Sequence, residues 1–180
     1  MKKLYTYSVL LLSLLSFAQK EGQDFCTGDK DGSYFPFITK KKLLWSSTYY
    51  FEESTGEKVL NGKTYNTYRQ TWKDGTVDYL YLREEDDKIL EYEKCCDTET
   101  VRYDEFYEPG HSWISEDKDV TYTLLSYDAE LKTPYCKYSH LMAVEAKYAT
   151  VTYIFYYLKG YGYVGAKSKD IVISAATPEW

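Results

Sequence analysis

Histidine is scarce in this chain of 180 residues, which contains two histidines, four prolines and two methionines. His111 and His140 are the only histidines, and this limits the sites open to a general base or a zinc ion. They do not lie at ligand spacing from each other, and Cys95-Cys96 lacks the two-residue gap with which paired thiolates share a tetrahedral ion. No serine has the strand-turn-helix context of a nucleophile elbow. We therefore expect no catalytic residue, no metal site and no cofactor, and a protein that is not an enzyme.

Two acidic stretches offer no better candidate. Asp29 to Gly32 is similar to a calcium loop, but the opening position is Thr27 and the closing acid is replaced by Ile38. The stretch from Glu84 to Asp87 could pair carboxylates as in glycoside hydrolysis, yet neighbouring acids at a turn point into water, where nothing raises one pKa. We interpret both stretches as solvated turns.

Clusters of basic residues are almost absent. Without Lys2 and Lys3, 20 basic residues of the 22 remain against 28 acidic ones, a formal charge of about −8. The only compact basic run, Lys40 to Lys42, stands at the start of an expected strand and is typical of a solvated edge. Nucleic acid is therefore excluded as a partner, because binding it requires clustered lysine and arginine.

The one sustained apolar run lies at the start of the chain. Lys2 and Lys3 precede the stretch from Val9 to Leu15, and Ser16-Phe17-Ala18 places small residues before Gln19, the pattern of a secretory signal peptide. Cleavage after residue 18 of 180 leaves 162 residues. No later segment approaches the roughly 20 apolar residues of a transmembrane helix. We expect an exported protein, periplasmic or extracellular, without a transmembrane segment in the mature chain.

Helical periodicity is also missing, and what the chain has instead is a succession of short β-type runs. Asn61-Gly62 and Asp74-Gly75 are strong hairpin signals, because tight turns need positive φ at these positions. Further turns are expected at Glu53 to Glu57 and at Glu84 to Asp87. Close spacing of strands and turns predicts an antiparallel sandwich or barrel. The expected strands, about ten in all, include Leu43 to Phe51, Thr64 to Trp72, Val77 to Arg83, Lys88 to Tyr92, Glu99 to Tyr107, Val120 to Tyr127, Tyr135 to Leu141 and Ile171 to Ser174.

The segment from Leu141 to Gly165 is predicted to form the central hairpin. Its first run alternates apolar with polar residues, as a strand with one buried face does, and its second run, Val151 to Leu158, is apolar on both sides. The two runs should pair across Tyr148-Ala149-Thr150, and the second strand should be covered on both faces.

Tyrosine is unusually abundant, with 22 residues. A tyrosine ring can pack in a core while its hydroxyl reaches water, so these strands could form packing, or the lining of a cavity for an apolar or sugar-like ligand. The residues predicted to bind such a ligand are Tyr79, Tyr81, Tyr153, Phe155 and Tyr157.

Four cysteines remain after cleavage: Cys26, Cys95, Cys96 and Cys136. Export to an oxidising compartment favours disulfides. We expect no bond between Cys95 and Cys96, because neighbouring side chains of an extended chain point to opposite sides and the eight-membered ring is strained. Cys26 should therefore pair with one of these two and Cys136 with the other; the sequence does not choose which.

Three motifs together resemble a known group of proteins: Asn61-Gly62-Lys63-Thr64-Tyr65; Tyr103-Asp104 with Pro109-Gly110-His111-Ser112-Trp113; and Tyr156 to Val164. Between about Trp45 and Gly165 the chain is similar to small exported β-rich proteins of unknown function of the Bacteroidota type. The resemblance implies a curved antiparallel sheet, comparable to lipocalins or lipoprotein carriers. It implies no catalytic residues.

These observations predict a signal peptide at 1–18, an irregular arm at 19–40 and one all-β domain at 41–180, a curved antiparallel meander closed fully or partly into a barrel with little or no helix. The predicted function is non-enzymatic binding of a small apolar or amphiphilic ligand in the sheet interior. The alternative is a cell-envelope interaction or structural protein that contacts a protein or glycan through an exposed aromatic face.

Overall fold

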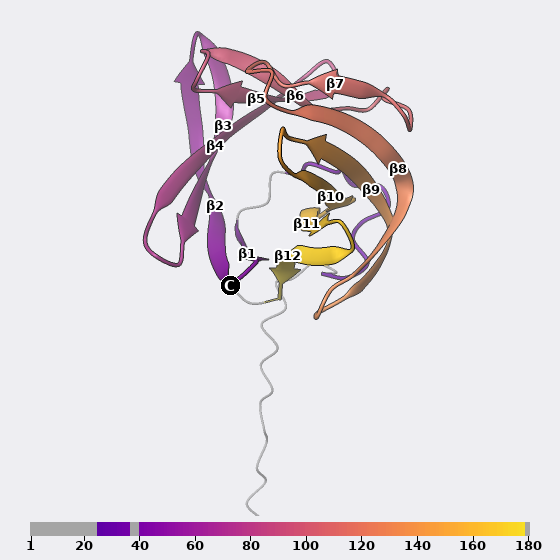
Figure 1. The fold of residues 1–180 in the computed structure, drawn as a ribbon. Helices are drawn as coiled ribbons and strands as arrows, with labels where there is room; N and C mark the ends of the chain where they lie inside the picture. The colour runs from indigo at the N-terminus through magenta and orange to yellow at the C-terminus, as the bar shows by residue number, and fades with distance from the viewer. Residues whose placement is uncertain (1–24, 37–39, 179–180) are drawn as a thin grey trace, which may run out of the picture.

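The computed structural model describes residues 25–36 and 40–178, so the expected signal peptide lies outside the described residues. Twelve antiparallel strands form a single sheet (Figure 1). This confirms the all-β meander, with two strands more than expected. The strands are β1 (Lys40–Trp45), β2 (Thr48–Leu60), β3 (Lys63–Trp72), β4 (Val77–Glu85), β5 (Lys88–Glu93), β6 (Thr98–Asp104), β7 (Ser112–Ile114), β8 (Thr121–Lys132), β9 (Lys137–Lys147), β10 (Thr152–Leu158), β11 (Gly162–Ser168) and β12 (Ile171–Thr177).

The sheet curls into a nearly closed barrel whose seam lies between consecutive strands. The order β6-β5-β4-β3-β2-β1-β12-β11-β10-β9-β8-β7 places the first and last strands side by side in the middle and β6 and β7 at the two edges. The edges meet at the top of the barrel (Figure 1). Trp113 Nε1 on β7 donates to the carbonyl of Val101 on β6 at 2.7 Å. Side-chain bonds thus join the edges where the strand ladder ends.

Two turns follow the sequence signals closely. Asn61 and Gly62 both have positive φ, 50° and 75°, and join β2 to β3. Asp86 and Asp87, with φ of 50° and 62°, form the acidic turn between β4 and β5. These predictions succeeded because the left-handed region is open to few residue types.

Two other assignments were wrong. The expected strand from Leu43 to Phe51 is divided by a turn at Ser46, which has a φ of 53°. The expected turn from Glu53 to Glu57 lies inside β2, where the register with β3 shifts between Ser54 and Glu57. A glycine signals a β-bulge as well as a turn, and here Gly56, with a φ of 99°, belongs to the bulge.

The central hairpin is confirmed. β9 and β10 pair from Thr152 opposite Lys147 to Tyr157 opposite Met142. Tyr156 and Tyr157, which point to opposite faces of β10, are both buried. Tyr157 on one face of β10 therefore looks into the barrel, and Tyr156 on the other packs in a second core with Leu131, Tyr138, Leu141 and Leu158.

Residues 25–36 form an arm that lies against the barrel near the β10–β11 turn. Asp29 N donates to the carbonyl of Lys159 at 2.9 Å, and Gly160 N donates to that of Ser33 at 2.8 Å. Further along the arm, the rings of Phe35 and Tyr157 have centroids 4.8 Å apart. The arm thus carries an aromatic residue onto the inner face of β10.

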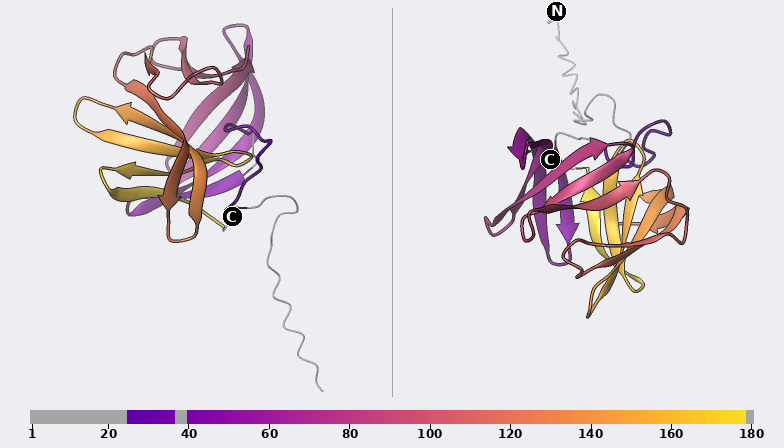
Figure 2. Two further views of the ribbon diagram at one scale, coloured as in Figure 1. Left: turned by 90° about the vertical axis from the view of Figure 1, so that its right-hand side faces the viewer. Right: turned by 90° about the horizontal axis from the view of Figure 1, so that it is seen from above.

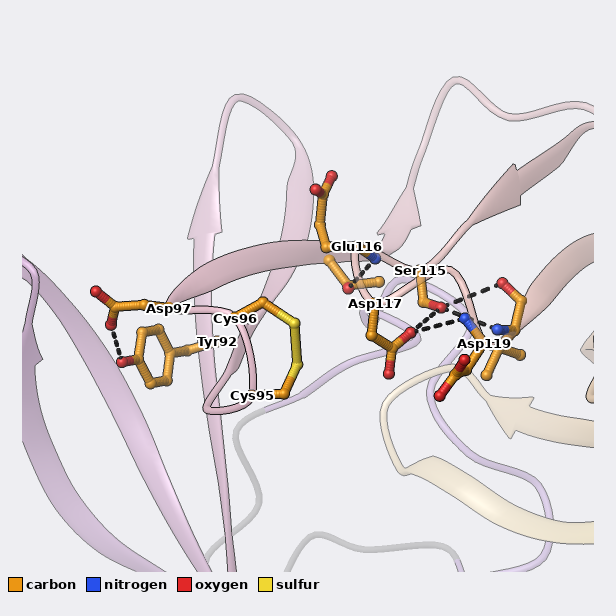
Figure 3. Close-up of a disulfide and its surroundings, with 10 residues drawn as sticks. Tyr92, Cys95, Cys96, Asp97, Ser115, Glu116, Asp117 and Asp119 are labelled. Atoms are coloured by element: carbon orange, nitrogen blue, oxygen red, sulfur yellow. Dashed lines mark hydrogen bonds between the residues drawn. A yellow bond between two sulfur atoms is a disulfide. The ribbon is translucent and has the colours of Figure 1, made fainter.

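All four cysteines are disulfide-bonded, but the expected pairing was wrong. Cys26 pairs with Cys136, with Cα atoms 5.6 Å apart, and Cys95 pairs with Cys96. The bond between Cys95 and Cys96 can form because Lys94 to Asp97 are not extended chain but a turn between β5 and β6. Within that turn the two neighbouring sulfur atoms lie on one side of the backbone (Figure 3).

A candidate ligand-binding cavity in the barrel

A cavity of about 150 Å³ lies inside the barrel, between the strands of its two halves. Figure 2 shows these halves facing each other around the interior. The lining consists of aromatic, aliphatic and charged side chains: Phe35 and Pro36 from the arm, Lys41 and Trp45 from β1, Tyr50 and Glu52 from β2, Tyr68 and Gln70 from β3, Leu80 and Leu82 from β4, Arg102 from β6, Phe155 and Tyr157 from β10, and Gly162 and Tyr163 from β11.

One wall of the cavity is aromatic. Phe155 and Tyr157 alternate along β10, so both point to its inner face. The ring of Tyr163 on the neighbouring strand β11 lies 5.9 Å from Phe155 and 5.8 Å from Tyr157, centroid to centroid. A flat apolar group placed against this wall would make the offset or edge contacts that aromatic rings prefer.

A row of polar side chains crosses the part of the wall formed by β1, β2 and β3. Lys41, Glu52 and Gln70 are register partners on β1, β2 and β3. Lys41 Nζ lies 3.6 Å from Glu52 Oε1, and Gln70 Nε2 donates to Glu52 Oε2 at 2.8 Å. Because Lys41 is 7% exposed, its ammonium group is largely dehydrated, and among the described residues Glu52 is the carboxylate that compensates its charge.

Arg102 reaches the cavity through a β-bulge. The register between β5 and β6 shifts so that Arg102 has no partner, and both it and Tyr103 take part in the interior contacts. Its Nε lies 2.8 Å from Glu91 Oε2, and its Nη1 donates to Tyr122 Oη at 3.1 Å. Burial raises the pKa of Glu91, while the Arg102 charge opposes that shift.

These contacts leave donors of Arg102 available. A guanidinium has five N–H groups, and within the described residues only one of them, on Nη1, makes a hydrogen bond, to Tyr122 Oη, while the contact with Glu91 is an ion pair. Because Arg102 also lines the cavity, N–H groups that have no partner among the described residues could bond a polar group bound there.

Tyr68 adds a buried hydroxyl to the same lining. The side chain is 4% exposed, and its Oη has no hydrogen-bond partner in the part of the chain that the structure describes. Burial, followed by the nearby Glu52 carboxylate, raises the pKa of Tyr68, which therefore stays protonated. A buried hydroxyl without a partner costs about 1 to 3 kcal/mol, so a group that could bond it would bind favourably.

The residues predicted from the sequence are divided between two faces. Phe155 and Tyr157 line the cavity, and Tyr153 extends their row with its ring 6.0 Å from that of Phe155. Tyr79 and Tyr81 lie on the face of β4 opposite to Leu80 and Leu82, which line the cavity in their place. Whether the inner residues bind a ligand stays a prediction.

The reason for this division is the composition of β4. Both of its faces carry large apolar side chains, so alternation alone does not identify the inner face. The charged lining residues Lys41, Glu52 and Arg102 were missed because polar residues in an amphipathic strand usually face water. The only local sequence signal for the cavity was the run Val151 to Leu158, in which both faces of β10 are apolar. Such a run indicates a strand that is covered on both sides.

The described residues contain no helix long and apolar enough to cross a bilayer. Within the same residues, no group of three or more histidine, cysteine, aspartate or glutamate side chains is arranged to hold a metal ion. His111 stacks on Tyr107, with ring centroids 3.8 Å apart, and His140 Nδ1 lies 2.6 Å from an exposed Asp128 carboxylate. Neither histidine lines the cavity.

Comparison with known proteins gives no family. No family model matches the chain, and no significant match is found among curated proteins. Among solved structures, one described as a "putative lipoprotein" from Parabacteroides distasonis matches with a TM-score of 0.42 and 9% sequence identity. The match covers 86% of this chain and 98% of that one. At this level the likeness supports neither a family nor an activity.

Proposed function

We propose that this protein is a non-enzymatic binding protein that holds a small amphiphilic ligand inside its barrel. The observation that carries the proposal is the cavity itself, which is lined by both aromatic rings and charged side chains within a barrel. A cavity of this volume, about 150 Å³, is large enough for a molecule the size of benzene. The ligand is therefore expected to be a single-ring compound or a group of similar volume.

The charges lining the cavity favour an acidic ligand. Within the part of the chain that the structure describes, Arg102 makes one hydrogen bond, to Tyr122 Oη, and Tyr68 Oη makes none. A carboxylate could accept bonds from both types of group, while its ring packs on Phe155 and Tyr157. An aromatic carboxylate is thus the ligand class that fits the lining best.

A titration of the mature chain with benzoate, toluene and benzylamine tests this proposal. Trp45 lines the cavity, so its fluorescence should report occupancy. We expect benzoate to bind most tightly, because toluene leaves the polar donors unpaired and benzylamine brings a positive charge towards Arg102. The absence of saturable binding by all three probes would refute the proposal.

A matched pair of variants locates the binding. Leu80→Trp replaces an aliphatic side chain in the cavity lining with a larger indole ring. Tyr79→Trp introduces the same ring on the other face of the same strand. We expect Leu80→Trp to weaken benzoate binding about tenfold or more, since its volume competes with the ligand, and Tyr79→Trp to leave it unchanged. Equal effects would place the site elsewhere.

We also propose that the protein works outside the cytoplasm. The bond between Cys26 and Cys136 supports this, because structural disulfides persist in oxidising compartments. Fractionation of cells that produce the full chain should recover the oxidised protein from the periplasm or the medium. Recovery of a fully reduced protein from the cytoplasm would contradict the proposal.

A second candidate function is contact with a glycan through the outer face of β4. Tyr79 is 45% exposed, and its ring lies nearly parallel to that of Tyr81, with an interplanar angle of 13°. Lys94 Nζ lies 5.6 Å from the Tyr79 ring and could bond sugar hydroxyls or carboxylates. If this face binds glycans, Tyr79→Ala should abolish retention on immobilised polysaccharide and leave benzoate binding intact.

A further inference from the structure

The bond between Cys95 and Cys96 differs from the other disulfide in what it can do for the fold. Cys26 and Cys136 are 110 residues apart, so their bond strongly restricts the unfolded chain. Cys95 and Cys96 are neighbours, and a bond between neighbours closes no loop of chain. By the loop-entropy argument, it contributes almost nothing to stability.

The turn that carries Cys95 and Cys96 is held by other bonds. The backbone N–H groups of Cys96 and Asp97 donate to the carbonyl of Glu93 at 3.3 and 3.0 Å. Tyr92 Oη donates to the Asp97 carboxylate, as Figure 3 shows, and Asn61 Nδ2 donates to the Asp97 carbonyl at 3.3 Å. None of these bonds needs the sulfur–sulfur bond, so the turn should survive its cleavage.

The two disulfides also differ in access. Cys95 and Cys96 are both exposed at the tip of the β5–β6 turn. Cys136 is 6% exposed and belongs to the second core. Since a thiolate must reach a sulfur atom to attack it, the vicinal bond is open to reagents in solution and the other is shielded on one side.

We propose that Cys95–Cys96 is a thiol–disulfide exchange site, which accepts two electrons from a thiol reductant outside the cytoplasm. A thiolate of the reductant attacks one of the two sulfur atoms and forms a mixed disulfide, while the Cys95–Cys96 bond breaks. The bonding electron pair stays on the other cysteine sulfur, which takes a proton from water. A second thiolate of the reductant then attacks the reductant sulfur of the mixed disulfide. The reductant leaves as an oxidised disulfide, and the second cysteine sulfur keeps the electron pair, takes a proton and becomes a thiol.

The neighbouring positions of the two cysteines make the site reversible. After reduction the thiols stay on adjacent residues of a turn that other bonds hold in place. When one of them forms a mixed disulfide with an oxidant, the other is close enough to displace it. The exposed pair therefore differs from a structural disulfide, which exchanges slowly and serves stability.

Selective reduction tests the proposal. The oxidised mature chain is incubated with increasing concentrations of reductant, its thiols are blocked with N-ethylmaleimide, and the labelled peptides are quantified by mass spectrometry. Two arms separate the sources of thiol: glutathione represents small thiols, and a purified thioredoxin-type dithiol protein represents protein reductants. The arm in which reduction requires less reductant identifies the class of partner.

We expect Cys95 and Cys96 to be labelled together at a thiol concentration at least about tenfold below that needed for Cys26 and Cys136. Cys95→Ser/Cys96→Ser is expected to lose the early phase and retain the late one. The same chain thus supplies its own control, because the Cys26–Cys136 bond meets the same reductant in the same tube.

Three results would overturn the proposal: reduction of both disulfides over one concentration range, earlier reduction of Cys26–Cys136, or free thiols at Cys95 and Cys96 in protein kept without reductant. A further check is the thermal unfolding midpoint. If selective reduction of the vicinal bond unfolds the protein, the bond is structural and the proposal fails.

Discussion

At the scale of single residues, Glu99 shows how a charge is accommodated on the face of the sheet opposite to the cavity. Its carboxylate accepts bonds from Arg83, from Tyr65 Oη at 2.6 Å and from Lys63 Nζ at 2.5 Å. The Arg83 hydrogen bond, against burial, lowers the pKa of Glu99 to about 2. Strands β3, β4 and β6 are thereby joined by one anion.

This lowered pKa predicts a pH dependence of stability. Glu99 has a folded-state pKa below its ordinary value, so its contribution is complete above about pH 4.5 and is lost as the pH falls towards about 2. Glu99→Gln should therefore be less stable than the wild type at pH 7 by about 2 to 3 kcal/mol, and the difference should shrink between pH 4.5 and 2. Urea unfolding of both proteins at several pH values measures it; a difference independent of pH would contradict the prediction.

At the scale of elements, the turn between β10 and β11 holds the arm. Gly160 has a φ of 73°, and a Cβ built there would lie 2.5 Å from Asp29 Cβ and 2.8 Å from Asp29 N. Gly75, in the turn after β3, also has a positive φ, of 88°, but a Cβ there would meet nothing within 4 Å. Substitution of Gly75 therefore tests the effect of backbone strain alone, whereas substitution of Gly160 tests backbone strain together with a steric clash with the arm.

Gly160→Ala is predicted to destabilise the protein more than Gly75→Ala does. Both substitutions force alanine into the left-handed region, which costs about 1 kcal/mol, and only the first also pushes the arm away. Chemical denaturation should show a loss for Gly160→Ala that exceeds the loss for Gly75→Ala by at least about 1 kcal/mol. Equal losses would mean that the arm does not pack against this turn.

Elements were predictable from the sequence where local chemistry decides them. Asn61-Gly62 predicted its hairpin because few other residues adopt that turn, and the apolar faces of β10 predicted an enclosed strand. The turn predicted around Gly56 was wrong because a glycine with positive φ occurs in β-bulges as well as in turns. The inner face of β4 and the position of Arg102 depend on how distant strands curl around each other, which no local pattern records.

At the scale of the whole molecule, the bond between Cys26 and Cys136 connects the arm to the start of β9 across most of the chain. We predict that Cys26→Ser/Cys136→Ser loses about 3 to 5 kcal/mol of unfolding free energy, because the closed loop spans 110 residues. Cys95→Ser/Cys96→Ser should lose less than about 1 kcal/mol, since its bond closes no loop. Denaturant titration of the two double variants makes the comparison, and similar losses would contradict it.

The barrel as a whole is held by β1 and β12 in the middle of the sheet and by side chains at the β6–β7 seam. This arrangement brings residues from β1 to β4, β6, β10 and β11 around one small space, although they are far apart in the sequence. The proposed function requires that this space is accessible to a ligand.

The most direct measurement is therefore an NMR study of the mature protein with benzoate, in which contacts between ligand and protein protons are identified. The account predicts contacts from the benzoate ring to Phe155, Tyr157 and Leu80, and none to Tyr79. Contacts to Tyr79 or other outer residues, or saturating benzoate without any contact to Phe155, Tyr157 and Leu80, would contradict it.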